Sequence, residues 1–358
     1  MLIDEPLVYD LSPRGPHTHA PRALCSQRRG WRFTFTLRVV SSSSSRSTPA
    51  YPDPGARVIE RIAVGIDGFD EGRDAAALGA TIARETGAEL LLVAVHPDPL
   101  VVLPRELGWT GLRRRAEAVL RETRDAIAPG ARIDIETDWS VPRALERVVK
   151  REQRDLLVLG SSRSGSDGSV RIGKRTRQLL CHSTCALAVA PRGLSAHPVR
   201  ELARGGVGYD GGPESNAALA VAGSIAQAVG AQLRVRGVVD DRLPAVGWSH
   251  LERERVKTMW DEILEPELRS LGDEAQRAAE ATTVAAEVEV LRGRPADALL
   301  ELADQVDLLV IGSRRWGTVA RVLLGSTGEA LLHDAPCPIM VVPRPDTDDG
   351  AAGPAQPE

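Results

Sequence analysis

The sequence predicts an α/β protein made of two tandem domains of the same kind, each built on a parallel sheet. The run Leu156–Ser161 is repeated almost unchanged as residues 308–313, and residues 64–68 are matched by residues 207–211. A repeat of roughly 150 residues is a whole domain, because solenoid repeats span about 20–50 residues. Short apolar runs alternate with helical patterns, which favours parallel strands joined by right-handed crossovers.

The length and composition fit this organisation and exclude some functions. A chain of 358 residues is long enough for two domains, each with its own core. A net charge of −4 argues against a nucleic-acid surface, which needs a basic field. No apolar run approaches the roughly 20 residues of a membrane span, so we expect a cytoplasmic protein without a membrane partner.

The domain boundaries follow from changes in composition. We expect one domain over residues 57–192 and the second over 204–344, with 193–203 as a linker. Residues 1–56 and 345–358 lack the pattern and are expected to be disordered tails. The cysteines have no Cys-x-x-Cys spacing, so we expect buried thiols and no metal site, although Cys181-His182-x-x-Cys185 is a weak alternative.

In the first repeat, five short apolar runs predict strands, and the segments between them predict helices. The run at 133–137 alternates in polarity and is therefore expected at a sheet edge. Gly87 ends the first helix, and Pro142 opens the third at a position that tolerates proline. His96 ends the second strand and is expected to be solvated. The strands are expected at 62–66, 90–95, 133–137, 156–159 and 186–190, and the helices at 74–86, 113–127, 142–149 and 176–181.

The second repeat follows the same order of elements. Equivalent residue numbers differ by 143 between Asp67 and Asp210, but by 152 between Gly160 and Gly312. About nine residues have therefore been inserted between these points, and a long second helix is the expected place. The strands are expected at 206–209, 233–239, 286–291, 308–311 and 339–342, and the helices at 213–229, 251–271, from 295 onward and at 326–333.

Two loops in each repeat carry unusual residues at strand ends. Asp67-Gly68 and Asp210-Gly211 follow the first strands, and the glycine-containing segments 160–173 and 312–325 follow the fourth strands. Ligands of open parallel sheets bind beyond the carboxyl ends of the strands, where the strand order reverses. If the first and fourth strands are neighbours, both loops of a repeat meet at one crevice.

The second loop of repeat 2 has the chemistry of an anion site. Its glycines let backbone N–H groups approach a phosphate, and Arg314 and Arg315 add positive charge. Ser326 and Glu329 have the spacing of a capping box, which predicts a helix N-terminus with unpaired N–H groups beside Gly325. From the spacing alone, glycines that serve only the turn are an equally good explanation.

These motifs resemble the universal stress protein family. The resemblance rests on the fourth strand followed by Gly-x-x-Gly-x9-Gly-Ser/Thr, on the Asp-Gly after the first strand, and on Ala335-Pro-Cys-Pro338 before the last strand. It covers residues 58–192 and 203–344, which is a tandem form of the family. It implies a sheet order of 3-2-1-4-5 in each domain, with helices on both faces and a fifth strand that pairs with another domain.

The resemblance also implies a site for ATP, with Mg²⁺ as its accompanying ion. The adenine side of the site would come from the first two strand ends, and the phosphate side from the glycine loop and the helix after it. On the adenine side these residues are Asp67, Gly68 and Val95 in repeat 1, and Asp210, Gly211 and Val239 in repeat 2. On the phosphate side they are Gly160, Arg163, Gly173 and Lys174 in repeat 1, and Gly312, Arg315, Gly317, Gly325, Ser326 and Thr327 in repeat 2.

Both repeats depart from the family motif. Arginine replaces its second glycine, as Arg163 and Arg315, and Lys174 replaces the final serine in repeat 1. Lysine has no acceptor with which to cap a helix, although its ammonium group can meet a phosphate as a point charge. We therefore expect repeat 2 to be the better nucleotide site.

The resemblance implies a regulatory protein that binds ATP or a related adenine nucleotide and reports stress or energy state to an unidentified protein partner. The alternative is an interaction module of the same fold without nucleotide. An enzyme is disfavoured, because the loop 210–215 only partly matches an ATP-pyrophosphatase loop and the match does not recur in repeat 1. The strands Ala186–Ala190 and Ile339–Val342 would otherwise be exposed edges, which favours an intramolecular pseudo-dimer, compatible with a further homodimer.

Overall fold

The computed structural model describes residues 59–96, 109–199, 201–242, 250–315, 322–323 and 325–343. The predicted tails at 1–56 and 345–358 and the predicted site residue Gly317 lie outside these ranges. Within them, no helix is both long enough and apolar enough to cross a membrane.

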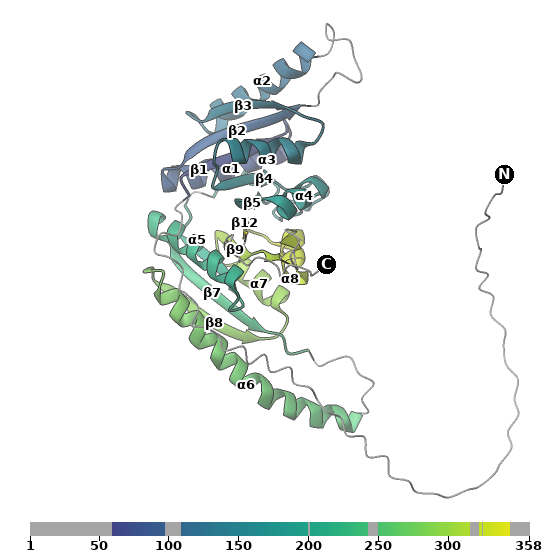
Figure 1. Ribbon diagram of the computed structural model, residues 1–358, viewed down its shortest axis with the longest axis vertical. Coiled ribbons are helices and arrows are strands. Elements are labelled where there is room, and N and C mark those ends of the chain that lie inside the picture. The colour runs from purple at the N-terminus through teal and green to yellow at the C-terminus, as the bar shows by residue number, and fades with distance from the viewer. Residues whose placement is uncertain are drawn as a thin grey trace, which may run out of the picture. The chain divides into compact units, whose positions relative to one another are not determined.

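Repeat 1 has nine elements in the predicted alternating order (Figure 1). Its helices begin somewhat earlier than predicted, and polar residues fill the first turns of α1 and α4. The first helix, for instance, starts with an acidic turn that suits the positive end of the helix dipole. The elements are β1 (Arg61–Ile66), α1 (Asp70–Thr86), β2 (Glu89–His96), α2 (Trp109–Ile127), β3 (Arg132–Thr137), α3 (Val141–Arg151), β4 (Leu156–Gly160), α4 (Lys174–His182) and β5 (Ala186–Ala190).

Repeat 2 repeats this order and adds a small two-stranded ribbon, β10 with β11. Its second helix spans 31 residues against 19 in repeat 1, which places the insertion there. The elements are β6 (Arg204–Tyr209), α5 (Pro213–Val229), β7 (Gln232–Val239), α6 (His250–Glu280), β8 (Ala286–Arg292), α7 (Pro295–Ala303), β9 (Leu308–Gly312), β10 (Arg314–Arg315), β11 (Val322–Leu323), α8 (Ser326–Asp334) and β12 (Ile339–Val342).

The ten long strands form one continuous sheet in the order β3-β2-β1-β4-β5-β12-β9-β6-β7-β8. Each half has the expected 3-2-1-4-5 order, and every pairing within a half is parallel. The halves join where β5 and β12 pair antiparallel, with Met340 opposite Ala188. The third strand of each half, β3 and β8, forms an edge of the sheet, as the alternating pattern of residues 133–137 predicted.

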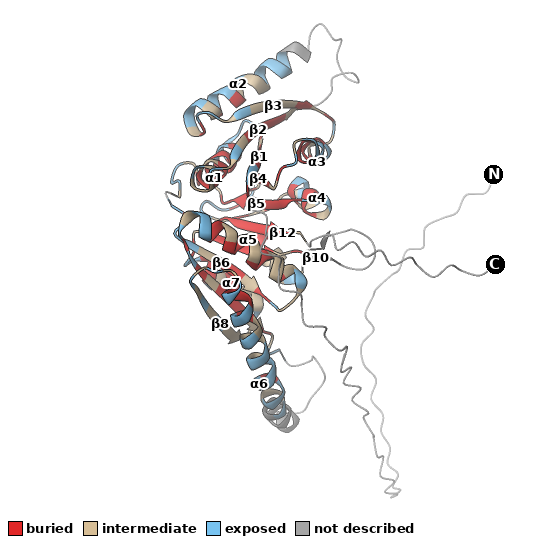
Figure 2. Ribbon diagram, turned by 60° about the vertical axis from the view of Figure 1, so that its left-hand side comes forward, coloured by how far each residue is buried: buried red, intermediate tan, exposed pale blue. Residues whose placement is uncertain are grey.

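Two apolar layers cover the two faces of the sheet (Figure 2). One layer takes its side chains from α1, α2, α5 and α6, and includes Leu78 and Leu219. The other takes them from α3, α4, α7 and α8, and includes Leu145 and Leu331. Both layers run through both repeats, so the pair of repeats shares its core across the β5–β12 junction.

Candidate functional site

The aspartate after the first strand of each repeat closes a tight turn. A carboxylate oxygen of Asp67 accepts a hydrogen bond from the Phe69 N–H at 3.1 Å, and one of Asp210 accepts from the Gly212 N–H at 3.0 Å. The intervening Gly68 and Gly211 have φ of 81° and 76°, which only glycine adopts without strain. The Asp-Gly pair therefore has a structural role in both repeats that needs no ligand.

The first glycine of each motif loop is required by packing. A Cβ on Gly160 would lie 2.0 Å from the Glu71 carbonyl oxygen, and a Cβ on Gly312 would lie 2.5 Å from the carbonyl group of Glu214. Glu71 and Glu214 sit in the first turns of α1 and α5. The glycines allow the helix N-terminus to approach the end of the fourth strand, which brings the two loops of a repeat together as predicted.

Repeat 2 has a cavity of about 360 Å³ where these loops meet. It lies at the carboxyl ends of β6 and β9, between α7 and the N-terminus of α8. Five of the predicted residues line it: Asp210, Gly312, Gly325, Ser326 and Thr327. The other lining residues are Gly208, Tyr209, Glu214, Ser215, Arg236, Val238, Pro295, Leu299, Ile311, Gly328 and Leu331.

The remaining residues predicted in repeat 2 are placed differently. Gly211 lies in the turn next to the cavity, and a Cβ on it would lie 3.0 Å from a Glu274 carboxylate oxygen. Val239 is buried and is not among the residues that line the cavity; its neighbour Val238 is, because successive strand residues face opposite sides of a sheet. Arg315 belongs to β10, and its side chain lies outside the described part of the structure.

The capping box predicted for Ser326 and Glu329 is wrong. The N-cap of α8 is Gly325, with extended backbone and no side-chain cap, and Ser326 is the first helical residue. The Glu329 side chain does not fold back on the helix, because it pairs with Arg177 of repeat 1. Ser326, Thr327 and Gly328 in the first turn of α8 line the cavity. No capping side chain accepts a hydrogen bond from the backbone N–H groups of this turn. A helix N-terminus of this kind is suited to binding an anion.

Arg236 is a cavity residue that the sequence reasoning missed. It lies on β7 opposite Glu289 of β8, and the corresponding place in repeat 1 has Val93 opposite Asp134. Its guanidinium donates to Glu289 at 2.5 Å and to the Ala298 carbonyl at 3.1 Å, while the buried Nε has no partner in the structure. When the two repeats are aligned, Val93 of repeat 1 corresponds to Arg236 of repeat 2. This difference is the sequence feature from which Arg236 could have been predicted as a cavity residue.

In repeat 1 the two loops contact each other through the side chain of Arg163. The Arg163 guanidinium lies 3.3 Å from the centre of the Phe69 ring, and its Nε lies 3.8 Å from a carboxylate oxygen of Glu71. Gly212 takes the place of Phe69 in repeat 2. The arginine proposed for phosphate binding in repeat 1 is therefore already engaged with an aromatic ring and an acidic group of its own domain.

The other predicted residues of repeat 1 lie at the start of α4 and near the end of β2. Gly173 is the N-cap of α4, and Lys174 is exposed as the first residue of that helix. Val95 is half-buried near the end of β2. His96 is not solvated as expected, because it is 4% exposed and its Nε2 lies 2.9 Å from the Thr137 hydroxyl.

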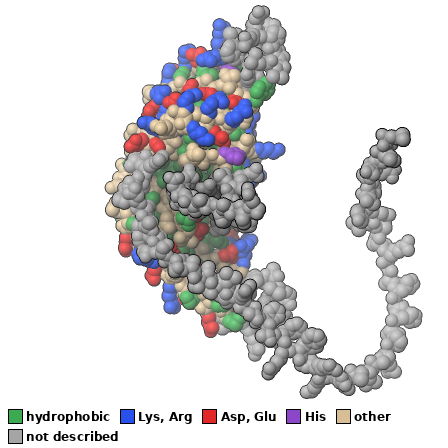
Figure 3. All heavy atoms as spheres, in the orientation of Figure 1, with side chains coloured by type: hydrophobic (Ala, Val, Ile, Leu, Met, Phe, Trp, Pro, Cys, Tyr) green, Lys and Arg blue, Asp and Glu red, His purple; other side chains and the backbone are tan. Residues whose placement is uncertain are grey.

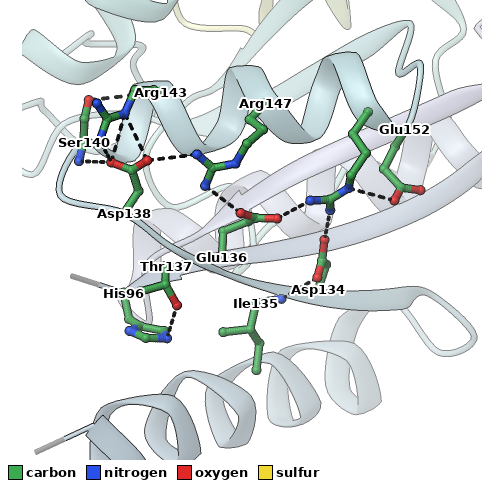
Figure 4. A network of polar contacts seen from close by, with 11 residues as sticks. His96, Asp134, Ile135, Glu136, Thr137, Asp138, Ser140, Arg143, Arg147 and Glu152 are labelled. Atoms are coloured by element: carbon green, nitrogen blue, oxygen red, sulfur yellow. Dashed lines mark hydrogen bonds and ion pairs between the residues drawn. The ribbon is translucent and has the colours of Figure 1, made fainter. Parts of the chain in front are cut away.

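A network of ion pairs joins β3 to α3 in repeat 1 (Figure 4). Arg147 bridges Asp138 and Glu136, and Arg151 bridges Glu136 and Asp134. Hydrogen bonds from the Arg143 guanidinium and from the Ser140 backbone N–H hold the pKa of the Asp138 carboxyl well below its usual range.

Acidic and basic side chains are interspersed on the face of the molecule drawn in Figure 3.

Two of the three described cysteines are buried thiols as expected, whereas Cys181 is only partly buried. Cys185 and Cys337 are buried, and burial raises their thiol pKa values to about 11 and about 12. No group of three His, Cys, Asp or Glu side chains in the described ranges is placed to hold a metal ion. Cys185 and Cys337 are packing residues in the layer formed by α3, α4, α7 and α8.

The fold and the cavity define a tandem, doubly wound α/β protein with a binding-type cavity at the carboxyl ends of the strands of its second domain. The chain belongs to the universal stress protein family, whose model matches residues 59–191 and again 205–343. This agrees with the resemblance drawn from the sequence.

Individual relatives match this chain over most of their own length. A universal stress protein of Mycobacterium tuberculosis is 26% identical over 294 residues, which is 78% of this chain and 96% of the relative. A single-domain relative from Thermus aquaticus is 33% identical over 137 residues, covering 37% of this chain and 93% of its own. Among solved structures, a universal stress protein of Archaeoglobus fulgidus matches with a TM-score of 0.56 at 18% identity, over 80% of this chain and 98% of its own, which shows the fold.

Proposed function

We propose that the protein is a regulatory member of its family that binds ATP or a related adenine nucleotide in repeat 2. The observation that carries this proposal is the cavity of about 360 Å³ in which Asp210 and the open first turn of α8 face the same space. The N–H groups of the first turn and the positive end of the α8 dipole suit the phosphates, and apolar Val238, Leu299 and Ile311 suit a base. Mg²⁺ would arrive with the phosphates.

Repeat 1 supports the proposal by contrast. Its Arg163 contacts both Phe69 and Glu71, whereas repeat 2 has Gly212 in the place of Phe69. We therefore assign nucleotide binding to one site per chain, and a role in assembly and partner contact to repeat 1. For repeat 1, the alternative function of a nucleotide-free interaction module therefore retains support.

The pairing of β5 with β12 supports an intramolecular pseudo-dimer. The contact buries both strands, with every residue of Ala186–Ala190 and Ile339–Val342 buried. A strand edge that would otherwise be open to another copy is covered in this way. We infer that the single chain is the working unit in the cytoplasm, that a further homodimer would use another surface, and that the chain signals through an unidentified protein partner.

The test uses two helices that start at equivalent positions. Ser326 and Lys174 are the first residues of α8 and α4. Ser326→Asp places a carboxylate where the phosphates would bind, and should weaken ATP binding at least about a hundred-fold, because juxtaposed like charges cost several kcal/mol. Calorimetry on the full chain measures this effect.

Lys174→Asp is the matched control and should leave ATP affinity unchanged. Both substitutions put an anion at a helix N-terminus, which stabilises a helix by about 0.3–1 kcal/mol, so neither should impair folding. Binding that survives Ser326→Asp, or that is lost in Lys174→Asp, would contradict the assignment to repeat 2.

A further inference from the structure

Two backbone N–H groups of the motif loop of repeat 1 donate hydrogen bonds to the other repeat. The Val170 N–H donates to the Ala335 carbonyl at 2.7 Å, and the Ile172 N–H donates to the Leu332 carbonyl at 3.0 Å. Leu332 is in the last turn of α8, and Ala335 is its C-cap. The last carbonyl groups of a helix have no partner within the helix, so a segment of repeat 1 supplies donors that the end of α8 lacks.

The side chains of Val170 and Ile172 pack in the same contact between the repeats. Val170 is fully buried and Ile172 is 6% exposed, in the layer that also contains Leu331, Leu332 and Cys337 of repeat 2. The segment is fixed at its base in repeat 1, because the Ser161 hydroxyl donates to the Ala190 carbonyl at 2.7 Å. The C-terminal end of α8 is therefore held by a well-anchored part of the other domain.

The first turn of α8 is held from the same side. Arg177 on α4 pairs with Glu329, three residues after the Ser326 that faces the cavity. In return, β11 of repeat 2 lies against α4. Helix α8 is thus tied to repeat 1 near both of its ends (Figure 1).

From this arrangement we propose that repeat 1 is a brace for the anion site of repeat 2, and that Arg177 and Glu329 are positioning residues for that site. A helix N-terminus binds a phosphate well only when its N–H groups are held at a fixed place, since reorganisation on binding costs affinity. Neither residue lines the cavity, so each acts through the position of α8. The inference rests on the proposed nucleotide function of repeat 2.

Two substitutions separate positioning from simple charge attraction. Arg177→Met and Glu329→Gln each break the pair. If Arg177 merely attracted phosphate, removing the negative charge of Glu329 would strengthen ATP binding. The brace predicts instead that both variants weaken it, by roughly two- to five-fold, which is the size that a partly exposed ion pair supports. Adenosine, which has no phosphate, should bind the parent and both variants equally.

The matched control is Arg121→Met, which breaks an exposed pair with Glu117 within α2. It should change neither ligand's affinity. Calorimetry with ATP and adenosine on the full chain gives all of these values. Stronger ATP binding in Glu329→Gln, or equal losses for ATP and adenosine, would overturn the brace.

Hydrogen exchange keeps this inference separate from the proposed function. Both variants should expose the α8 backbone amides between residues 329 and 333 to faster exchange than in the parent, whether or not nucleotide is present. If the parent binds neither ATP nor adenosine, the nucleotide proposal fails, and faster exchange would still show that repeat 1 holds α8. Unchanged exchange in both variants would overturn the brace.

Discussion

Arg163 stacks on Phe69, with 3.3 Å between the guanidinium carbon and the centre of the ring. This contact distinguishes the two repeats, because Gly212 stands where repeat 1 has Phe69. In repeat 1 these side chains join the two loops, whereas in repeat 2 Glu214, the counterpart of Glu71, lines the cavity.

The stack should make a small, measurable contribution to stability. Phe69→Leu keeps an apolar side chain but removes the ring, and should lower the free energy of unfolding by about 0.5–1 kcal/mol, as expected for an exposed cation–π contact. A double-mutant cycle with Arg163→Met in urea unfolding measures the coupling directly. Coupling indistinguishable from zero would show that the stack does not close the repeat 1 site.

The first glycine of each motif loop should prove necessary for stability and not for ligand contact alone. Gly160→Ala places a Cβ 2.0 Å from the Glu71 carbonyl oxygen, so it should destabilise the protein by about 1–3 kcal/mol or more. Gly173→Ala is the control, because its Cβ would have no neighbour closer than 3.8 Å. Thermal unfolding of both variants checks this, and equal stability would contradict the packing role.

Arg236→Val should be neutral or stabilising. The substitution copies Val93 at the equivalent place in repeat 1 and removes a guanidinium that is mostly buried. Its partner Glu289 is about half exposed and remains hydrated. Replacing a buried charge by an apolar side chain is often neutral or favourable. Urea unfolding of Arg236→Val and Glu289→Gln, each compared with the parent, tests this. A decrease of more than about 3 kcal/mol in the free energy of unfolding of Arg236→Val would show that the ion pair itself holds β7 and β8 together.

Asp138 should stabilise the protein above its unfolded-state pKa and progressively less below it. Because the folded-state pKa is lowered, chiefly by hydrogen bonds from Arg143, the contribution is full above about pH 4 and declines as pH falls toward the folded value. Asp138→Ala should cost about 1–2 kcal/mol at pH 7. Unfolding of parent and variant at pH 7, 5 and 3 measures the difference in their free energies of unfolding, which should be smaller at pH 3. A difference that stays constant with pH would show that the ionised Asp138 carboxylate is not the source of the stabilisation.

The sequence predicted the sheet well because its apolar runs are buried on both faces. Strand order came from the family resemblance, and the edge position of β3 came from its alternating pattern. Helix starts were less accurate, since polar first turns such as Asp70-Glu71 carry no apolar signal. The capping box failed because Gly325 supplies the N-cap geometry by its backbone, while Glu329 is drawn to Arg177 of the other repeat.

The cavity itself was only partly predictable. Local motifs placed Asp210, Gly312 and Ser326 together, because β6 and β9 end at the same edge and the motif loop after β9 leads to α8. Arg236 was missed, since it lies within an otherwise apolar strand, and its ion pair crosses to β8. Contacts between the repeats, such as Ile172 with Leu332, depend on how the domains pack and leave no trace in local patterns.

The most direct test of the account is the number of ATP molecules bound per chain, measured by calorimetric titration of the full protein. One site per chain, lost in Ser326→Asp and retained in Lys174→Asp, is the predicted result. Two sites would show that Phe69 and Arg163 do not close repeat 1. No binding would contradict the nucleotide function and leave an interaction module.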